Sequence, residues 1–183
     1  MTDRAGPILV LLRGINVGGR ALVPMAGLRS ALSEEGLTGV RTHLQSGNVL
    51  ADSGSETAET LGRRVESVIE DRFGVTVRAI TRTAADLADL ERRNPFLGSG
   101  SPGSGVHTVF LAAAPDPRRI GDLDPDRSPP DRFQLSGREI FVHYPQGSGR
   151  SKLDLDYFER KLAVAGTARN WNTVSALLGM VGV

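Results

Sequence analysis

The stretch ILVLLRGINVGGR at residues 8–20 decides how this chain begins to fold. Its first five residues are all apolar and do not alternate with polar ones, which is typical of a strand buried on both faces. The strand leads directly into a loop that is rich in glycine and carries a carboxamide and two guanidinium groups. Glycine lets the backbone approach a ligand closely, so we expect a binding site beside the first strand.

The rest of the first half predicts a helix, a hairpin, a second helix and a closing strand. A proline and a glycine bound the first helix at 24–36, and a two-residue turn at 46–47 joins two short strands. A capping box at 53–56 precedes the second helix, which ends at Gly74. The alternating residues 75–79 then predict a half-buried strand.

The second half repeats this order of elements. It predicts a strand at 106–113, a short helix from 116–117, a hairpin with its turn at 136–137, a helix behind a capping box at 151–154, and a strand at 167–171. The fold class that follows is α+β, with two tandem ferredoxin-like (β-α-β-β-α-β) subdomains packed together.

The predicted domain organisation has three parts. Residues 1–97 form the first subdomain, together with a connecting helix that a Thr83-x-x-Asp86 box caps. Residues 98–105 are a loop rich in glycine and serine, and residues 106–183 form the second subdomain with a C-terminal helix.

Composition excludes several classes of protein. The 22 basic and 21 acidic residues nearly balance at a net charge of +1, so no overall basic field attracts nucleic acid. The chain has no cysteine, which fits a reducing compartment, and its apolar run near the N-terminus is too short for a signal core or a membrane span. We therefore expect a cytoplasmic protein without a membrane partner.

The predicted topology gathers polar residues into two clusters. In this motif the loop after the first strand meets the central hairpin at one edge of the sheet, and the loop after the third strand meets the end of the fourth strand at the other. The first predicted cluster contains Arg13, Asn16, Gly18, Gly19, Arg20, Gln45, Ser46 and Asn48. The second contains Arg150, Ser151, Lys152, Arg169, Asn170 and Asn172. We expect both clusters to line one cleft if the halves pack edge to edge.

Two interpretations of these residues stay open. Residues 150–152 are placed at a helix N-terminus, where free N–H groups, the helix dipole and two cations favour an anion. A solvated cap with a glycine-rich turn explains the same residues without a ligand. Likewise, the glycines of the first loop fit a tight connection at positive φ. Trp171 is interpreted as a core residue that anchors the two halves, with a stacking platform for a ligand as the alternative.

Familiar catalytic and cofactor motifs are absent. The loop at 14–21 nearly matches a phosphate-binding P-loop, but Arg20 replaces the lysine and Ala21 the hydroxyl that binds Mg²⁺. No dinucleotide-binding fingerprint follows a strand, and the three histidines have no metal-binding spacing. The strands that bind RNA in ferredoxin-like domains carry no aromatic residue here. We therefore predict no metal and no cofactor, and we assign no catalytic residue.

Several of these segments resemble one bacterial family. LRGINVGG at 12–19, QSGNV at 45–49, HYP at 143–145, GRSKL at 149–153 and RNWNT at 169–173 are similar to motifs of the family known as domain of unknown function 1697. The resemblance spans nearly the whole chain and implies two ferredoxin-like subdomains. It implies no activity, substrate or catalytic residue.

The function predicted from these observations is binding of a small anionic or nucleotide-like ligand in a cleft lined by polar loops of both halves. One alternative is a non-catalytic nucleic-acid-binding module that uses the same basic residues, with an affinity that falls steeply with salt. The other is a protein-interaction module in which the two clusters only organise the interface between the halves.

Overall fold

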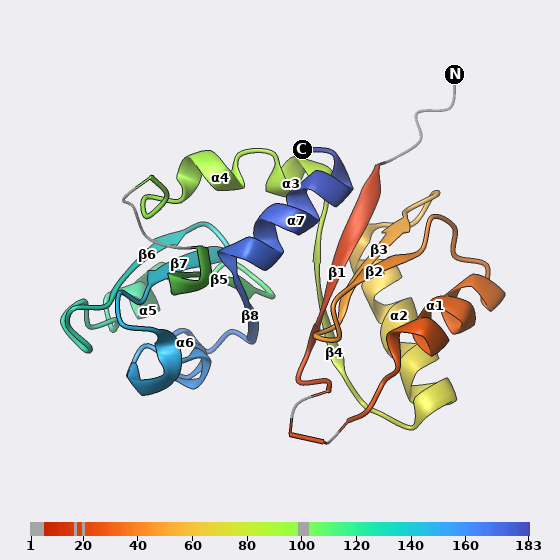
Figure 1. Ribbon diagram of the computed structural model, residues 1–183, viewed down its shortest axis with the longest axis horizontal. Helices are drawn as coiled ribbons and strands as arrows, with labels where there is room; N and C mark the ends of the chain where they lie inside the picture. Colours follow the sequence, from red (N-terminus) through yellow and green to blue (C-terminus); the bar gives the residue numbers. More distant parts are fainter. Residues whose placement is uncertain (1–5, 17, 20, 99–102) are drawn as a thin grey trace. The chain divides into compact units, whose positions relative to one another are not determined.

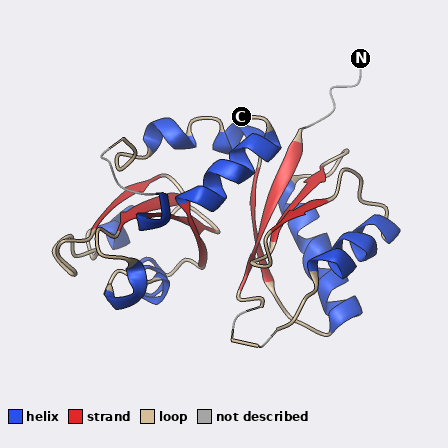
Figure 2. Ribbon diagram, viewed as in Figure 1, coloured by secondary structure: helices blue, strands red, loops and turns tan. Residues whose placement is uncertain are grey.

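The structure is a computed structural model that describes residues 6–16, 18–19, 21–98 and 103–183 (Figure 1). The chain forms two compact units: unit 1 contains Met1–Ala88 and Leu177–Val183, and unit 2 contains Asp89–Ala176. Each unit has one four-stranded antiparallel sheet with helices packed beside it, so the protein belongs to the mixed α+β class (Figure 2). No helix among the described residues is both long and apolar enough to span a lipid bilayer.

Unit 1 is built around the strand that opens the sequence. Its elements are β1 (Pro7–Arg13), α1 (Met25–Glu34), β2 (Arg41–His43), β3 (Asn48–Asp52), α2 (Ala58–Phe73), β4 (Arg78–Arg82) and α3 (Ala84–Leu87). The sheet order is β2-β3-β1-β4, which places β1 in the interior, and residues 8–12 are at most 3% exposed. The apolar faces of α1 and α2 cover one face of the sheet and form a single core with it (Figure 1).

Unit 2 has the same order of strands and main helices. Its elements are α4 (Leu90–Arg93), the 3-10 helix η1 (Gly103–Gly105), β5 (Val106–Leu111), α5 (Pro117–Ile120), β6 (Arg132–Ser136), β7 (Glu139–His143), the 3-10 helix η2 (Ser148–Arg150), α6 (Leu155–Leu162) and β8 (Gly166–Asn170). The sheet order is β6-β7-β5-β8, and α6 packs its apolar face on this sheet. The last helix, α7 (Trp171–Val181), begins in unit 2 and ends in unit 1.

The boundary between the two units lies earlier in the chain than the loop of glycine and serine at 98–105. The first unit ends at Ala88, whereas the sequence places the end of the first subdomain at residue 97. The reason is that α4 packs within unit 2: Arg93 donates to the carbonyl of Ser136 at 3.0 Å and to the Glu139 carboxylate at 2.9 Å. Burial alone lowers the pKa of Arg93, but the hydrogen bonds to Glu139 and Asp89 outweigh it and the pKa is raised. This ion-paired cluster fixes α4 to the sheet of unit 2.

Three local predictions for unit 1 are wrong. Thr57 caps α2 by accepting a hydrogen bond from the N–H of Thr60, so the predicted capping box at 53–56 does not form. The hairpin between β2 and β3 has a four-residue loop at 44–47, because His43 pairs with Asn48 and Leu44 adopts a φ of 58°. In addition, the closing strand is Arg78–Arg82, three residues later than predicted.

Three local predictions for unit 2 also need correction. The turn between β6 and β7 is Gly137–Arg138, one residue later than predicted, because Ser136 still pairs with Glu139. The last strand ends at Asn170, and Trp171 starts α7 as a buried residue. The capping box at 151–154 does not form, because α6 begins only at Leu155. The capping box of Thr83 and Asp86, by contrast, is confirmed at the start of α3.

Candidate functional site

Asn16 joins the glycine-rich loop of unit 1 to the tip of the β2–β3 hairpin. Its side-chain N–H group donates to the carbonyl of Gln45 at 2.7 Å and to the carbonyl of Val23 at 3.0 Å. Its side-chain oxygen accepts from the N–H of Val23 at 2.8 Å. The residue has a φ of 54°, a backbone conformation that asparagine tolerates better than most residues. One side chain therefore closes the loop on itself and fastens it to the hairpin.

The remaining described members of the first cluster lie around this connection. Asn48 is buried and donates to the carbonyl of His43 and to the hydroxyl of Ser46. Gly18 and Gly19 have φ values of 58° and 73°, with open space where a Cβ atom would stand. Arg13 ends β1 and pairs with Arg78 of β4, whereas Arg20 lies outside the described residues. The structure thus brings the two stretches of the first cluster together, and their role in binding stays a prediction.

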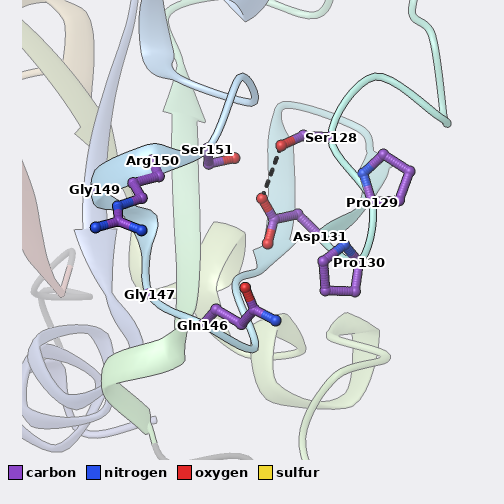
Figure 3. Close-up of a pocket in the computed structure, with 9 residues that line it drawn as sticks. All are labelled: Ser128, Pro129, Pro130, Asp131, Gln146, Gly147, Gly149, Arg150 and Ser151. Atoms are coloured by element: carbon purple, nitrogen blue, oxygen red, sulfur yellow. Dashed lines mark hydrogen bonds between the residues drawn. The ribbon is translucent and has the colours of Figure 1, made fainter.

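The second cluster contributes to a pocket of about 450 Å³ in unit 2 (Figure 3). One wall is the turn at 128–131 and the other is the loop at 146–151. The lining residues are Ser128, Pro129, Pro130, Asp131, Gln146, Gly147, Gly149, Arg150 and Ser151. Two residues predicted from the sequence, Arg150 and Ser151, therefore line a pocket. Lys152, Arg169, Asn170 and Asn172 are not among the lining residues.

Hydrogen bonds hold the two walls of the pocket together. The N–H of Lys152 donates to the Ser128 hydroxyl at 3.1 Å, and the Nε of Arg127 donates to the carbonyl of Lys152 at 2.9 Å. The guanidinium of Arg127 also lies 4.3 Å from the ring centre of Tyr157, which is buried under it. Because these contacts involve two backbone groups of Lys152, that residue supports the pocket through its main chain.

Asp131 is the pocket residue that sequence reasoning missed. It is 8% exposed, and its Oδ2 accepts from the Ser128 hydroxyl at 3.0 Å while its N–H donates to the Ser128 carbonyl. The other carboxylate oxygen points away from Ser128, toward the side of the pocket that holds Gln146 (Figure 3). In the sequence Asp131 stands in a stretch rich in proline and aspartate, and no pattern distinguishes it from Asp124 or Asp126.

The predicted helix N-terminus at residues 150–152 is wrong. Asp154 is the N-cap of α6, and its carboxylate accepts from the N–H of Tyr157 at 2.7 Å. The hydroxyl of Ser151 accepts from the N–H of Leu153 instead. The negative charge of Asp154 already lies at the positive end of the helix dipole. This helix N-terminus therefore does not favour a second anion. Any anion in the pocket has to be held by Arg150 and by the loop.

The polar residues at the end of β8 make structural contacts. The buried guanidinium of Arg169 donates to the Thr167 hydroxyl and to the carbonyl of Ala168, each at 2.8 Å. Burial lowers the pKa of Arg169 to about 10, so the group still carries its charge at neutral pH. Asn170 accepts from the N–H of Thr173 and so supports the start of α7, while Asn172 is exposed.

Tyr144 connects the pocket loop to the core of unit 2. Its buried hydroxyl donates to the carbonyl of Leu153 at 2.7 Å, and its ring meets that of His107 edge to face. Burial raises the pKa of the Tyr144 phenol, and the negative charges of Asp131 and Asp154 raise it further. Burial is the larger cause, so the raised pKa chiefly reflects the dry surroundings of the phenol.

Tyr144 should make the protein lose stability in strong alkali. An unfolded tyrosine ionises near pH 10, whereas the folded phenol keeps its proton to higher pH. Its stabilising contribution is therefore complete below about pH 10 and is lost as the pH rises above that value. In thermal unfolding between pH 8 and 12, the melting temperature of the wild type should fall more steeply above pH 10 than that of Tyr144→Phe. Parallel curves would contradict this expectation; Tyr157 is present in both proteins.

No group of three or more histidine, aspartate or glutamate side chains arranged to hold a metal ion occurs within the described ranges. What the pocket offers is a guanidinium, a carboxylate, an amide and a hydroxyl. Side chains of these kinds are able to form hydrogen bonds with charged and polar parts of a small molecule.

The comparisons with known proteins agree with the resemblance seen in the sequence. No curated protein matches the chain. A solved structure, that of the conserved bacterial protein SP0830 from Streptococcus pneumoniae, has the same fold with a TM-score of 0.74 and 21% sequence identity. The alignment covers 96% of this chain and 98% of that one. The model of the family described as "Protein of unknown function (DUF1697)" matches residues 6–141, and the chain therefore belongs to this family.

Proposed function

We propose that this protein binds a small ligand with an anionic group, such as a nucleotide-like molecule, and that the pocket of unit 2 is where it binds. The observation that carries the proposal is the pocket itself, which places an arginine and several hydrogen-bonding groups around about 450 Å³. This volume is within the range of roughly 300–1,000 Å³ that is usual for sites of small molecules and cofactors.

The chemistry of the loop at 146–151 suits an anionic group. Arg150 is exposed, and its planar guanidinium can pair with a phosphate or a carboxylate through two parallel hydrogen bonds. Gly147 has a φ of 84°, and at Gly149 a Cβ atom would meet nothing within 4 Å. Ligand atoms can therefore come close to the backbone of this loop at its glycines.

Thermal unfolding with added anions tests the proposal. Inorganic phosphate and adenosine monophosphate at millimolar concentration should raise the melting temperature of the wild type by several degrees, since a ligand at 100 times its Kd stabilises by about 2.7 kcal/mol. Arg150→Gln should lose most of this shift. Arg160→Gln removes an exposed guanidinium from α6 and should keep it.

Two results would contradict the proposal. One is a wild-type melting temperature that no anion raises, and the other is a shift of equal size in the wild type and in Arg150→Gln. A shift produced by a short oligonucleotide alone, with a steep dependence on salt, would instead favour nucleic-acid binding.

We also propose that both units are ferredoxin-like, that they arose by duplication and that the protein is cytoplasmic. The identical sheet orders and the matching positions of α1 and α2 with α5 and α6 support the first two statements. The absence of cysteine supports the third.

A further inference from the structure

The pocket contains the carboxylate of Asp131, and the protein supplies a hydrogen bond to one of its two oxygens. Asp131 is more than nine-tenths buried, and Ser128 supplies the hydrogen bond to one of its two side-chain oxygens. Within the described part of the chain, no lysine, arginine or histidine lies within ion-pair distance of it. Its second oxygen points into the pocket (Figure 3).

The second oxygen of Asp131 is therefore available to a donor from a ligand. Burying an ionised carboxylate is unfavourable unless a cation or several donors compensate it. Ser128 gives its hydroxyl proton to Asp131 and receives the N–H of Lys152, so its capacity as a donor is used. A second carboxylate, that of Asp154, lies close enough to influence the same tyrosine as Asp131 does. These two carboxylates favour a positive group in front of Asp131.

We infer that the ligand of this pocket is a small zwitterion, whose ammonium group pairs with Asp131 and whose anionic group pairs with Arg150. The inference rests on the proposed function and names the class of ligand more narrowly. Asp131 comes from the turn and Arg150 from the loop, and in Figure 3 the Arg150 side chain extends away from Asp131. Because Arg150 is exposed, its long side chain can turn toward a bound ligand. Gln146 and Ser151 supply neutral hydrogen bonds between them.

A matched pair of phosphates separates the contribution of the amine. O-phosphoethanolamine and ethyl phosphate have the same phosphate ester and the same two-carbon chain, and only the former carries an ammonium group. By titration calorimetry at pH 7, the wild type should bind O-phosphoethanolamine about tenfold or more tightly than ethyl phosphate. Asp131→Asn should reduce this preference to roughly twofold, and Arg150→Gln should weaken both compounds.

The outcomes distinguish the inference from the proposed function. Equal affinities for the two phosphates in the wild type would overturn the inference and leave the anion site intact. A preference that Asp131→Asn preserves would also overturn it, since the amine would then bind elsewhere. Adenosine monophosphate and its 2′,3′-dideoxy analogue give a further comparison. If only the former binds tightly, Asp131 accepts hydrogen bonds from the two ribose hydroxyl groups and not from an ammonium group. Binding of neither phosphate would contradict the site itself, and the inference with it.

The stability of the ligand-free protein gives a second test that does not depend on the probe. Asparagine can still accept the hydrogen bond from Ser128 while removing the buried charge. Asp131→Asn should therefore raise the melting temperature of the free protein by about 2–4 °C. Asp122→Asn, which removes an exposed carboxylate from the same unit, should leave it nearly unchanged. A lower melting temperature for Asp131→Asn would show that the carboxylate is a structural partner of Ser128 and would overturn the inference.

Discussion

Replacing Asn16 with aspartate is expected to destabilise unit 1 by about 2–4 kcal/mol. The carboxamide of Asn16 donates to two backbone carbonyls, those of Gln45 and Val23, and accepts from the N–H of Val23. At neutral pH a carboxylate keeps the accepted bond but loses both donated bonds, and its second oxygen then faces two carbonyl oxygens. Aspartate tolerates the positive φ about as well as asparagine, so the loss measures these contacts and not backbone strain.

Chemical denaturation and amide hydrogen exchange together check this expectation. Asn16→Asp should lower the denaturation midpoint and speed exchange at the N–H of residue 16, which donates to the carbonyl of Ala21 within the same loop. The deficit should shrink as the pH falls toward 4, because the protonated acid regains a donor. Asn172→Asp is the control: the residue is exposed in the first turn of α7, where a negative charge is neutral or favourable. Equal losses in the two variants would show that Asn16 does not fasten the loop.

The expected proximity of the glycine-rich loop and the hairpin follows from the order of elements. Because β1 and β3 are antiparallel neighbours in this order, the end of one must lie beside the start of the other. The backbone contact between Leu12 and Gly47 and the side-chain contact between Asn16 and Gln45 are direct consequences. The apolar run of β1, the apolar stripes of α1 and α2 and the turn residues of the hairpin were sufficient for this result.

Residues that mark the ends of helices predicted the structure less well than the spacing of apolar residues did. Serine and threonine both cap helices, and the sequence offers Ser53 and Thr57 within one turn of each other. The structure uses Thr57, because the carboxylate of Glu56 pairs with Arg64 instead of returning to a cap. Similarly, Ser151 and Asp154 compete at α6, and the carboxylate is the cap. Such choices depend on partners far along the chain, which a four-residue pattern does not contain.

Only one of the two walls of the pocket could be predicted from the sequence. Arg150 and Ser151 stand in a loop of glycine and polar residues, which is a recognisable signal. The opposite wall is a turn 15 or more residues earlier, and it comes close because Lys152 donates to Ser128. No periodic pattern encodes this contact or the one from Arg127 to the carbonyl of Lys152. Asp131 is buried in the turn that they hold, so sequence reasoning could not identify it.

Gly47 has a backbone geometry that only glycine fits without strain. Its φ is 78°, and a Cβ atom there would stand 2.7 Å from the Cβ of Leu12 and 2.7 Å from the Cδ1 of Ile15. Both neighbours are almost fully buried, and the N–H of Leu12 donates to the Gly47 carbonyl at 2.8 Å. The neighbours cannot move away without opening the core or breaking the bond that joins hairpin and strand.

Gly47→Ala should therefore destabilise unit 1 by about 2–4 kcal/mol, the sum of left-handed strain and overpacking. Gly54→Ala isolates the strain, because Gly54 has a φ of 55° with open space around the Cβ position, and it should cost only about 1–2 kcal/mol. Ile15→Val removes the Cδ1 atom and should cost less in the Gly47→Ala background than in the wild type, which denaturation midpoints of the four proteins measure. Strict additivity would mean that the Ile15 contact is not the source of the loss.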